Sequence, residues 1–184
     1  MRIESLRILG VDPGTNISGY GLVQITNDKP SIMTMGILRP EKLSDHYSRL
    51  KYLHERALNV IDEYKPEVLA IEAPFYGKNV QSMLKLGRAQ GVIMAAALYR
   101  SLPIFEYAPL LVKQSITGMG RASKEQVAYF LQKTFHLVNL PRELDATDAV
   151  AVAICHFIQK SKPAFTSDYK NWNDFIAKNP DRVK

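Results

Sequence analysis

The sequence has a single cysteine and no long apolar run. One cysteine, Cys155, excludes an internal disulfide and a zinc site built from several cysteines. Because Cys155 lies in the apolar run 149–158, we expect it to be a small buried core residue. No apolar run approaches the roughly 18 residues of a transmembrane helix, so we expect no membrane partner. The N-terminal Met-Arg-Ile-Glu does not resemble a secretory signal, and we therefore expect a cytoplasmic protein.

Acidic residues are fewer than basic ones. The 184 residues include 24 lysines and arginines against 18 aspartates and glutamates, a formal net charge of +6. This surplus mildly favours a polyanionic partner. Repeats and low-complexity tracts are lacking, and 46% of the residues are hydrophobic, which is enough to build a core. We expect one domain over residues 1–160 and a basic C-terminal tail over 161–184, partly helical or flexible.

Hydrophobic periodicity predicts the order of the secondary structure. Strands are expected over residues 6–12, 17–26, 31–38, 68–71 and 104–107. Helices are expected over residues 46–64, about 79–101, from Ser123 onward and over about 145–158. Asn79 is expected to cap the second helix, and Ser123 with Gln126 fits a capping box. The order predicts an α/β protein with a five-stranded mixed sheet, three antiparallel strands and then two parallel ones, flanked by helices.

Two acids follow buried strands directly. The first strand ends on Asp12 before the turn signal Pro13-Gly14, and the strand Val68–Ile71 is followed by Glu72. Asp12 alone could be a turn residue, but burying an unpaired carboxylate such as Glu72 is costly. If the two strands are parallel neighbours, both carboxylates emerge at the carboxyl edge of the sheet, where ligands commonly bind.

Two more acids begin an apolar helix. Asp145 and Asp148 are three residues apart and therefore share one helix face. Acids in this position also satisfy free N–H groups and the helix dipole without any further role. Together with Asp12 and Glu72, however, they could supply the oxygen ligands of two hard divalent cations. Two such metals can activate water and stabilise the leaving oxygen of a phosphodiester.

Four stretches resemble the RuvC family of Holliday junction resolvases, in the family's order over roughly residues 6–158: LGVDPGTNISGYGLV, IEAPFYGKNVQSMLKLGRAQGV, FEYAPLLVKQSITGMGRASKEQV and DATDAVAVAICH. The resemblance implies a ribonuclease H-like fold and a homodimer that needs Mg²⁺, or Mn²⁺ in its place, with two ions per subunit. It implies paired symmetric nicks in four-way DNA junctions, with 5′-phosphate and 3′-hydroxyl ends, in homologous recombination and DNA repair. It also implies the branch-migration partners RuvA and RuvB.

Carried over by position, the resemblance assigns catalysis and metal binding to four acids: Asp12, Glu72, Asp145 and Asp148. It places Lys113 and Lys124 near the scissile phosphate and the DNA, where a lysine would offset charge that develops in the transition state. Phe75 matches an aromatic near the junction centre that could wedge between bases. Without the resemblance, solvated lysines and a core aromatic are equally good interpretations. Further candidates for phosphate contacts are Lys78, Lys85, Arg88 and Arg121.

Small residues recur every fourth position in the helix expected over about 79–101, at Gly87, Gly91 and Ala95. They would let another backbone approach closely. Either this helix packs tightly on its own sheet, or it builds the dimer interface that the resemblance implies.

The sequence is also consistent with three alternative functions. The stretch GVDPGTNISGYG is also similar to the phosphate loop of actin-like and sugar-kinase ATPases, but that fold usually needs two such domains and leaves Asp145 and Asp148 unexplained. A catalytically silent junction-binding protein is the second, and the intact set of acids argues against it. The third keeps the fold but cuts RNA in an RNA–DNA hybrid.

Overall fold

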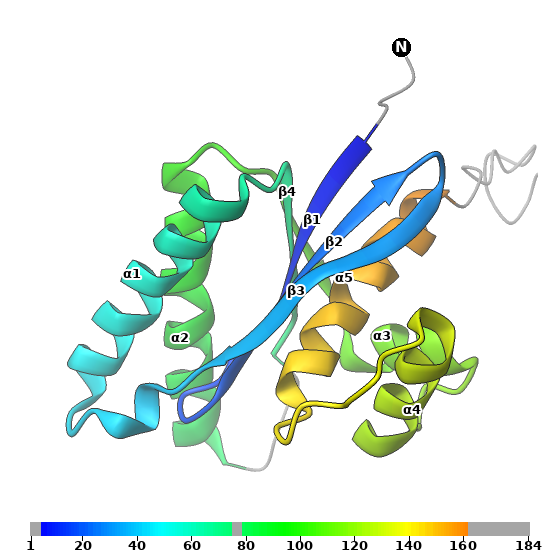
Figure 1. The fold of residues 1–184 in the computed structure, drawn as a ribbon. Helices are drawn as coiled ribbons and strands as arrows, with labels where there is room; N and C mark the ends of the chain where they lie inside the picture. The colour runs from blue at the N-terminus through cyan, green and yellow to red at the C-terminus, as the bar shows by residue number, and fades with distance from the viewer. Residues whose placement is uncertain (1–4, 75–78, 162–184) are drawn as a thin grey trace, which may run out of the picture.

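A computed structural model of the chain describes residues 5–74 and 79–161 (Figure 1). Its centre is one five-stranded sheet in the order β3-β2-β1-β4-β5. The strands are β1 (Ser5–Asp12), β2 (Ser18–Thr26), β3 (Lys29–Leu38), β4 (Val68–Glu72) and β5 (Ile104–Tyr107). The pairs β1–β2 and β2–β3 are antiparallel, whereas β1–β4 and β4–β5 are parallel. The predicted mixed sheet is confirmed.

Helices cover both faces of the sheet (Figure 1). The helices α1 (His46–Tyr64) and α2 (Val80–Tyr99) lie on one face, and a short 3-10 turn, Pro40–Lys42, precedes α1. The other face carries α3 (Pro109–Thr117), α4 (Lys124–Phe135) and α5 (Asp145–Ser161). Successive side chains of β1 alternate between the two cores, because Ile8 belongs to the core under α5 and Leu9 to the core under α1 and α2. Burial on both faces explains why β1 is almost continuously apolar.

Local signals set the helix starts as predicted. The Asn79 side chain accepts a hydrogen bond from Ser82 N at 3.1 Å and caps α2. Ser123 and Gln126 form the predicted reciprocal capping box at α4. These caps satisfy free N–H groups of the first helical turn, and they fix where Lys124 enters α4.

Two features differ from the sequence-based expectation. The hairpin between β2 and β3 turns on two residues, Asn27 and Asp28, whose φ angles are 50° and 61°, so that β3 begins at Lys29 rather than at residue 31. A two-residue turn with positive φ suits the twist of the flanking strands, and Pro30 is tolerated because β3 is an edge strand. The second feature is α3, to which the sequence analysis assigned no range. It begins at Pro109, a favoured first helical residue.

Glycines let α5 approach the sheet closely. A Cβ atom on Gly10 would lie 2.1 Å from the carbonyl oxygen of Ala149, and one on Gly19 would lie 1.8 Å from that of Asp145. Both distances are far below van der Waals contact, so only glycine fits at these positions. The close packing places the first turn of α5 beside the end of β1.

Replacing Gly19 by alanine should therefore destabilise the protein. The new methyl group must push the start of α5 away from β2, and overpacking of this kind costs about 1–3 kcal/mol or more. Urea unfolding followed by circular dichroism measures the loss. Glu55→Ala is the control, since Glu55 lies on the exposed side of α1 and alanine favours the helix. Equal stability of Gly19→Ala and the wild type would contradict the packing argument.

The structure can be compared with the expectations for Cys155, for membrane helices and for the C-terminal tail. Cys155 is fully buried in α5, as predicted. None of the helices in residues 5–74 and 79–161 combines the length and the hydropathy that a membrane-spanning helix needs. The tail predicted for 161–184 lies outside the described residues from residue 162 onward, and so do Phe75 and Lys78.

Candidate active site

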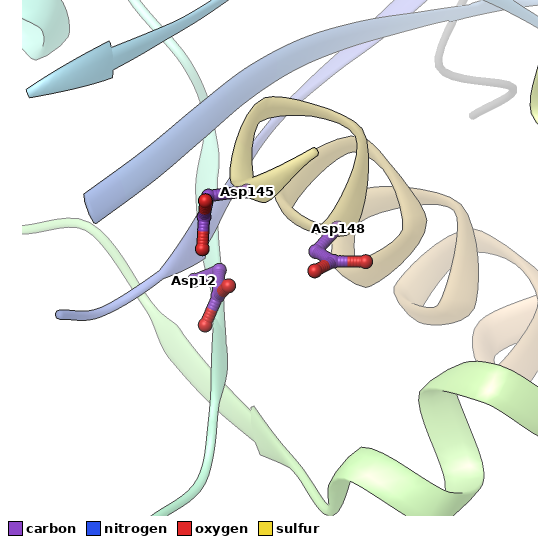
Figure 2. Close-up of side chains that lie close together, drawn as sticks. All are labelled: Asp12, Asp145 and Asp148. Carbon is purple, nitrogen blue, oxygen red and sulfur yellow. The ribbon is translucent and has the colours of Figure 1, made fainter. Parts of the chain in front are cut away.

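Three carboxylates meet where β1 ends and α5 begins (Figure 2). Oxygen atoms of Asp12, Asp145 and Asp148 lie within 4.8 Å of one another. Asp12 is the last residue of β1, and Ser18 Oγ donates a hydrogen bond to its carbonyl oxygen at 3.1 Å. Asp145 and Asp148 project from the first turn of α5 toward it. The helix face that the spacing of these two acids predicts is therefore the face that meets the end of β1.

Glu72 lines the same hollow but does not belong to this group of three. It ends β4, and the parallel register that pairs Val11 with Ile71 brings it to the same edge of the sheet as Asp12. The Gln90 side chain donates to the Glu72 carbonyl oxygen at 3.3 Å and to Glu106 Oε2 at 2.9 Å. This buried amide of α2 ties together the ends of β4 and β5.

Lys124 places its ammonium group among the three aspartates. Its Nζ atom lies 2.6 Å from Asp148 Oδ2, 3.1 Å from Asp145 Oδ1 and 3.7 Å from Asp12 Oδ2. Burial alone would lower the pKa of Lys124, but the hydrogen bond to Asp148 and the nearby carboxylates outweigh it and raise that pKa. The side chain is nonetheless 48% exposed, so it has room to leave the carboxylates.

Burial opposes ionisation of the acids in this hollow. It raises the pKa of Asp12 to about 7, with Lys124 acting against it and Asp148 and Asp145 adding to it. Burial, together with the charges of Asp12 and Asp148, raises the pKa of Glu72 to about 8. The pKa of Asp148 is also raised, mainly by burial. One lysine therefore does not neutralise the cluster, and a bound divalent cation would favour its ionised form.

The raised pKa values predict a pH-dependent stability for the metal-free chain. Between pH 6.5 and 8.5 the folded protein holds protons on Asp12 and Glu72 that unfolded carboxyl groups, with a pKa near 4, have already lost. Stability should therefore fall as the pH rises through this window, by on the order of 1–3 kcal/mol. Urea unfolding in a chelator at several pH values measures the slope.

Asp12→Asn serves as the control for this pH dependence, because it removes one titrating group and should flatten the slope. A wild-type stability that stays constant or rises from pH 6.5 to 8.5 would show that these carboxyl groups are ionised in the folded chain.

The other predicted residues differ in whether they line the hollow that contains the acids. Lys113 of α3 lines the same hollow and lowers the pKa of Glu72 slightly against the effect of burial. Lys85 lines a neighbouring hollow. Arg88 and Arg121 are exposed and line neither hollow. The roles assigned to these residues, and to Phe75 and Lys78, stay predictions.

Sequence reasoning missed three residues that support the site: Ser18, Gln90 and Arg39. Arg39, directly after β3, forms ion pairs with Glu41 at 3.1 Å and with Glu143 just before α5. The sequence pattern does indicate a role for Gln90, since it is a polar residue on the buried side of a largely apolar helix. No local sequence pattern indicates a role for Arg39, because its partner Glu143 is 104 positions away in the chain.

The donor set fits a hard divalent cation. Carboxylate oxygens are the ligands that Mg²⁺, Mn²⁺ and Ca²⁺ prefer. Among the described residues, the group of three contains neither histidine nor cysteine, the ligands typical of zinc. Asp12, Asp145 and Asp148, with Glu72 beside them, are the residues that would hold such an ion.

Comparison with known proteins identifies the family. The profile of the family described as "Crossover junction endodeoxyribonuclease RuvC" matches residues 8–156. The chain belongs to the RuvC family. RuvC of Bacteroides fragilis is 56% identical over 179 residues, covering 96% of this chain and 95% of the relative. RuvC of Porphyromonas gingivalis is 55% identical over 183 residues, covering 96% of each chain.

A solved RuvC structure shares the fold. Thermus thermophilus RuvC, solved in complex with a Holliday junction substrate, superposes with a TM-score of 0.77 at 29% identity, covering 84% of this chain and 94% of that one. The predicted ribonuclease H-like fold is confirmed. Membership of the RuvC family also decides against the ATPase interpretation of the loop after β1.

Proposed function

We propose that this RuvC protein is an endonuclease that resolves four-way DNA junctions by paired symmetric nicks, in recombination and repair. The observation that carries the proposal is the convergence of Asp12, Asp145 and Asp148 at one edge of the sheet, with carboxylate oxygens within 4.8 Å. That cluster suits metal-dependent hydrolysis of a phosphodiester. The matched Thermus thermophilus RuvC was solved with a Holliday junction substrate.

In the proposed mechanism the acids bind metal ions and the lysines bind the scissile phosphate. We infer that the three aspartates and Glu72 hold two Mg²⁺ ions, for which Mn²⁺ can substitute. When bound, the ions supply an activated water and charge neutralisation at the leaving oxygen. Lys113 and Lys124, which line the hollow, bind oxygens of the scissile phosphate and offset its developing charge. The products then carry 5′-phosphate and 3′-hydroxyl ends.

We also infer a homodimer, because two opposed strands must be cut and a two-fold dimer matches the symmetry of the junction. The outer face of α2 supports this proposal. It exposes four large apolar residues, Val80, Leu84, Leu98 and Tyr99. Between them, Gly87 and Gly91 face open space within the single chain. RuvA and RuvB as partners, and the cytoplasm as the compartment, belong to the same proposal.

A large charged residue at the centre of this face should prevent dimer formation. Gly91→Arg should convert the protein to a monomer at micromolar concentration while keeping it folded, since arginine favours a helix more than glycine does. Sedimentation velocity measures the change. Glu55→Arg, on the exposed side of α1, is the matched control. A Gly91→Arg protein that sediments as a dimer would place the interface elsewhere.

Cleavage of an end-labelled synthetic four-way junction tests the function itself. A matched duplex and an RNA–DNA hybrid are run beside it, each with Mg²⁺ and with a chelator. We expect paired, symmetric, Mg²⁺-dependent nicks on the junction alone. Junction binding without cleavage would mean a silent junction-binding protein, and cleavage of the hybrid alone would mean a different substrate.

A further inference from the structure

A second hollow adjoins the catalytic one. It has a volume of about 380 Å³ and is lined by Thr15, Asn16, Ser44, His46, Arg49, Ser82 and Lys85. Chain neighbours line the two hollows. Pro13, Gly14 and Ile17 of the loop after β1 line the catalytic hollow, whereas Thr15 and Asn16 of the same loop line the second. On α2, Leu86 lines the first and Lys85 the second.

Arg49 is held in place in this hollow by neutral groups. Its Nε atom donates to the Leu43 carbonyl oxygen at 2.9 Å, and its Nη1 atom donates to Asn16 Oδ1 at 3.2 Å. Within residues 5–74 and 79–161, neither Arg49 nor Lys85 has a carboxylate partner. A guanidinium oriented by neutral acceptors keeps its full charge for an anion, and its remaining N–H groups suit a phosphate.

The remaining lining adds hydrogen-bond donors. Thr15, Ser44 and Ser82, each with a hydroxyl group, line the hollow, and α1 and α2 both begin beside it, at His46 and Val80. The N-terminus of α2, capped by the neutral Asn79, adds positive potential to the site, whereas the Asp45 carboxylate that caps α1 offsets the potential of that helix. The His46 Nε2 atom is buried, and the described part of the chain offers it no hydrogen-bond partner.

Two acids, Glu41 and Asp45, lie close to the hollow in the sequence, and both have partners. Glu41, whose N–H group donates to the Asn16 carbonyl oxygen at 3.2 Å, forms an ion pair with Arg39 at 3.1 Å. Asp45 caps α1 and accepts a hydrogen bond from Ser48 N at 2.9 Å through its Oδ1 atom. It does not line the hollow, and among residues 5–74 and 79–161 no other acidic residue does. Within this described part of the chain, the hollow is therefore a polar pocket lined by Arg49 and Lys85 and by no acid, at the same edge of the sheet as the catalytic acids.

We propose that this hollow binds a backbone phosphate of the DNA strand that enters the catalytic hollow, next to the scissile phosphate along that strand. The proposal rests on the proposed function, since it takes the DNA path through the catalytic hollow as given. The site reads no bases. It sets the register of the strand, so that one particular phosphodiester reaches the acids.

The test measures binding of a labelled four-way junction, in a chelator, at several salt concentrations. Arg49→Gln and Lys85→Gln should each weaken binding about three- to tenfold and lower the salt slope by about one. Lys51→Gln is the matched control, because it removes one charge from the exposed side of α1, where Lys51 pairs with Glu55 at 3.7 Å. Lys85→Gln, at an exposed position without an ion pair in the described chain, keeps the test valid even if Arg49→Gln disturbs the loop.

Neutral methylphosphonates placed one at a time along the cut strand identify the phosphate. One substitution beside the scissile position should weaken wild-type binding more than it weakens binding by Arg49→Gln or Lys85→Gln, because each variant has already lost one of the two cationic contacts to that phosphate. If both variants bind the junction like Lys51→Gln, the proposal of a second phosphate site is wrong. It is also wrong if every methylphosphonate weakens binding by the wild type and by the variants equally. These results are separate from the failure of the proposed function, in which the wild type would not cut the junction with Mg²⁺.

Discussion

Asp12→Asn should lower junction cleavage by about a thousandfold or more, while junction affinity in a chelator stays within about threefold of wild type. Asp12 is the one member of the carboxylate group that comes from the sheet, and it faces both Asp145 and Asp148 (Figure 2). Asparagine keeps the shape of the side chain but loses the negative charge that holds a cation. Single-turnover cleavage under saturating protein measures the loss.

Mn²⁺ binding, followed by electron paramagnetic resonance, gives an independent readout for Asp12→Asn and should show weaker binding. Asp28→Asn is the control, because it removes the same charge from the exposed β2–β3 turn, where positive φ suits asparagine. An Asp12→Asn protein that cuts at the wild-type rate would show that the metal site is elsewhere.

Lys124→Met should have two opposite effects. Cleavage should fall about a hundredfold, because the scissile phosphate loses one of the two lysines that line the hollow. Divalent metal affinity in the absence of DNA should instead rise about tenfold. In the metal-free chain the ammonium group lies 2.6 Å from Asp148 Oδ2 and 3.1 Å from Asp145 Oδ1, so an incoming ion must displace it. Methionine keeps the apolar stem and removes this competitor.

Calorimetric titration with Mn²⁺ measures the affinity, and urea unfolding of the metal-free protein supplements it. The variant should be less stable without metal at pH 8, where three neighbouring carboxylates are left without their cation, and metal should restore more stability to it than to the wild type. Lys133→Met on the same helix is the control, since Lys133 lies over the Tyr129 ring and away from the acids. Weaker metal binding by Lys124→Met would mean that the lysine supports the ion rather than competing with it.

Local patterns predicted most of the fold, because each depends on neighbours in the chain. Apolar periodicity located the five strands, and the structure confirmed the caps at Asn79 and Ser123. The errors were local as well. Because proline is typical of turns, the sequence predicts a β2–β3 turn that is two residues longer than the observed one, and it predicts no range for α3.

The sequence by itself determined the residue types of the candidate site, and it placed Asp12 and Glu72 at the ends of two strands. Strands that end on Asp12 and Glu72 and run parallel must present both at one edge. Tertiary structure alone decided that α5 lies close enough to bring Asp145 to Asp12, which requires glycine at positions 10 and 19. It also decided that Lys124 enters the acid cluster and that Arg49 meets Asn16 beside it. The physical reason is that periodicity and capping act over a few residues, whereas these contacts depend on how distant helices pack on the sheet.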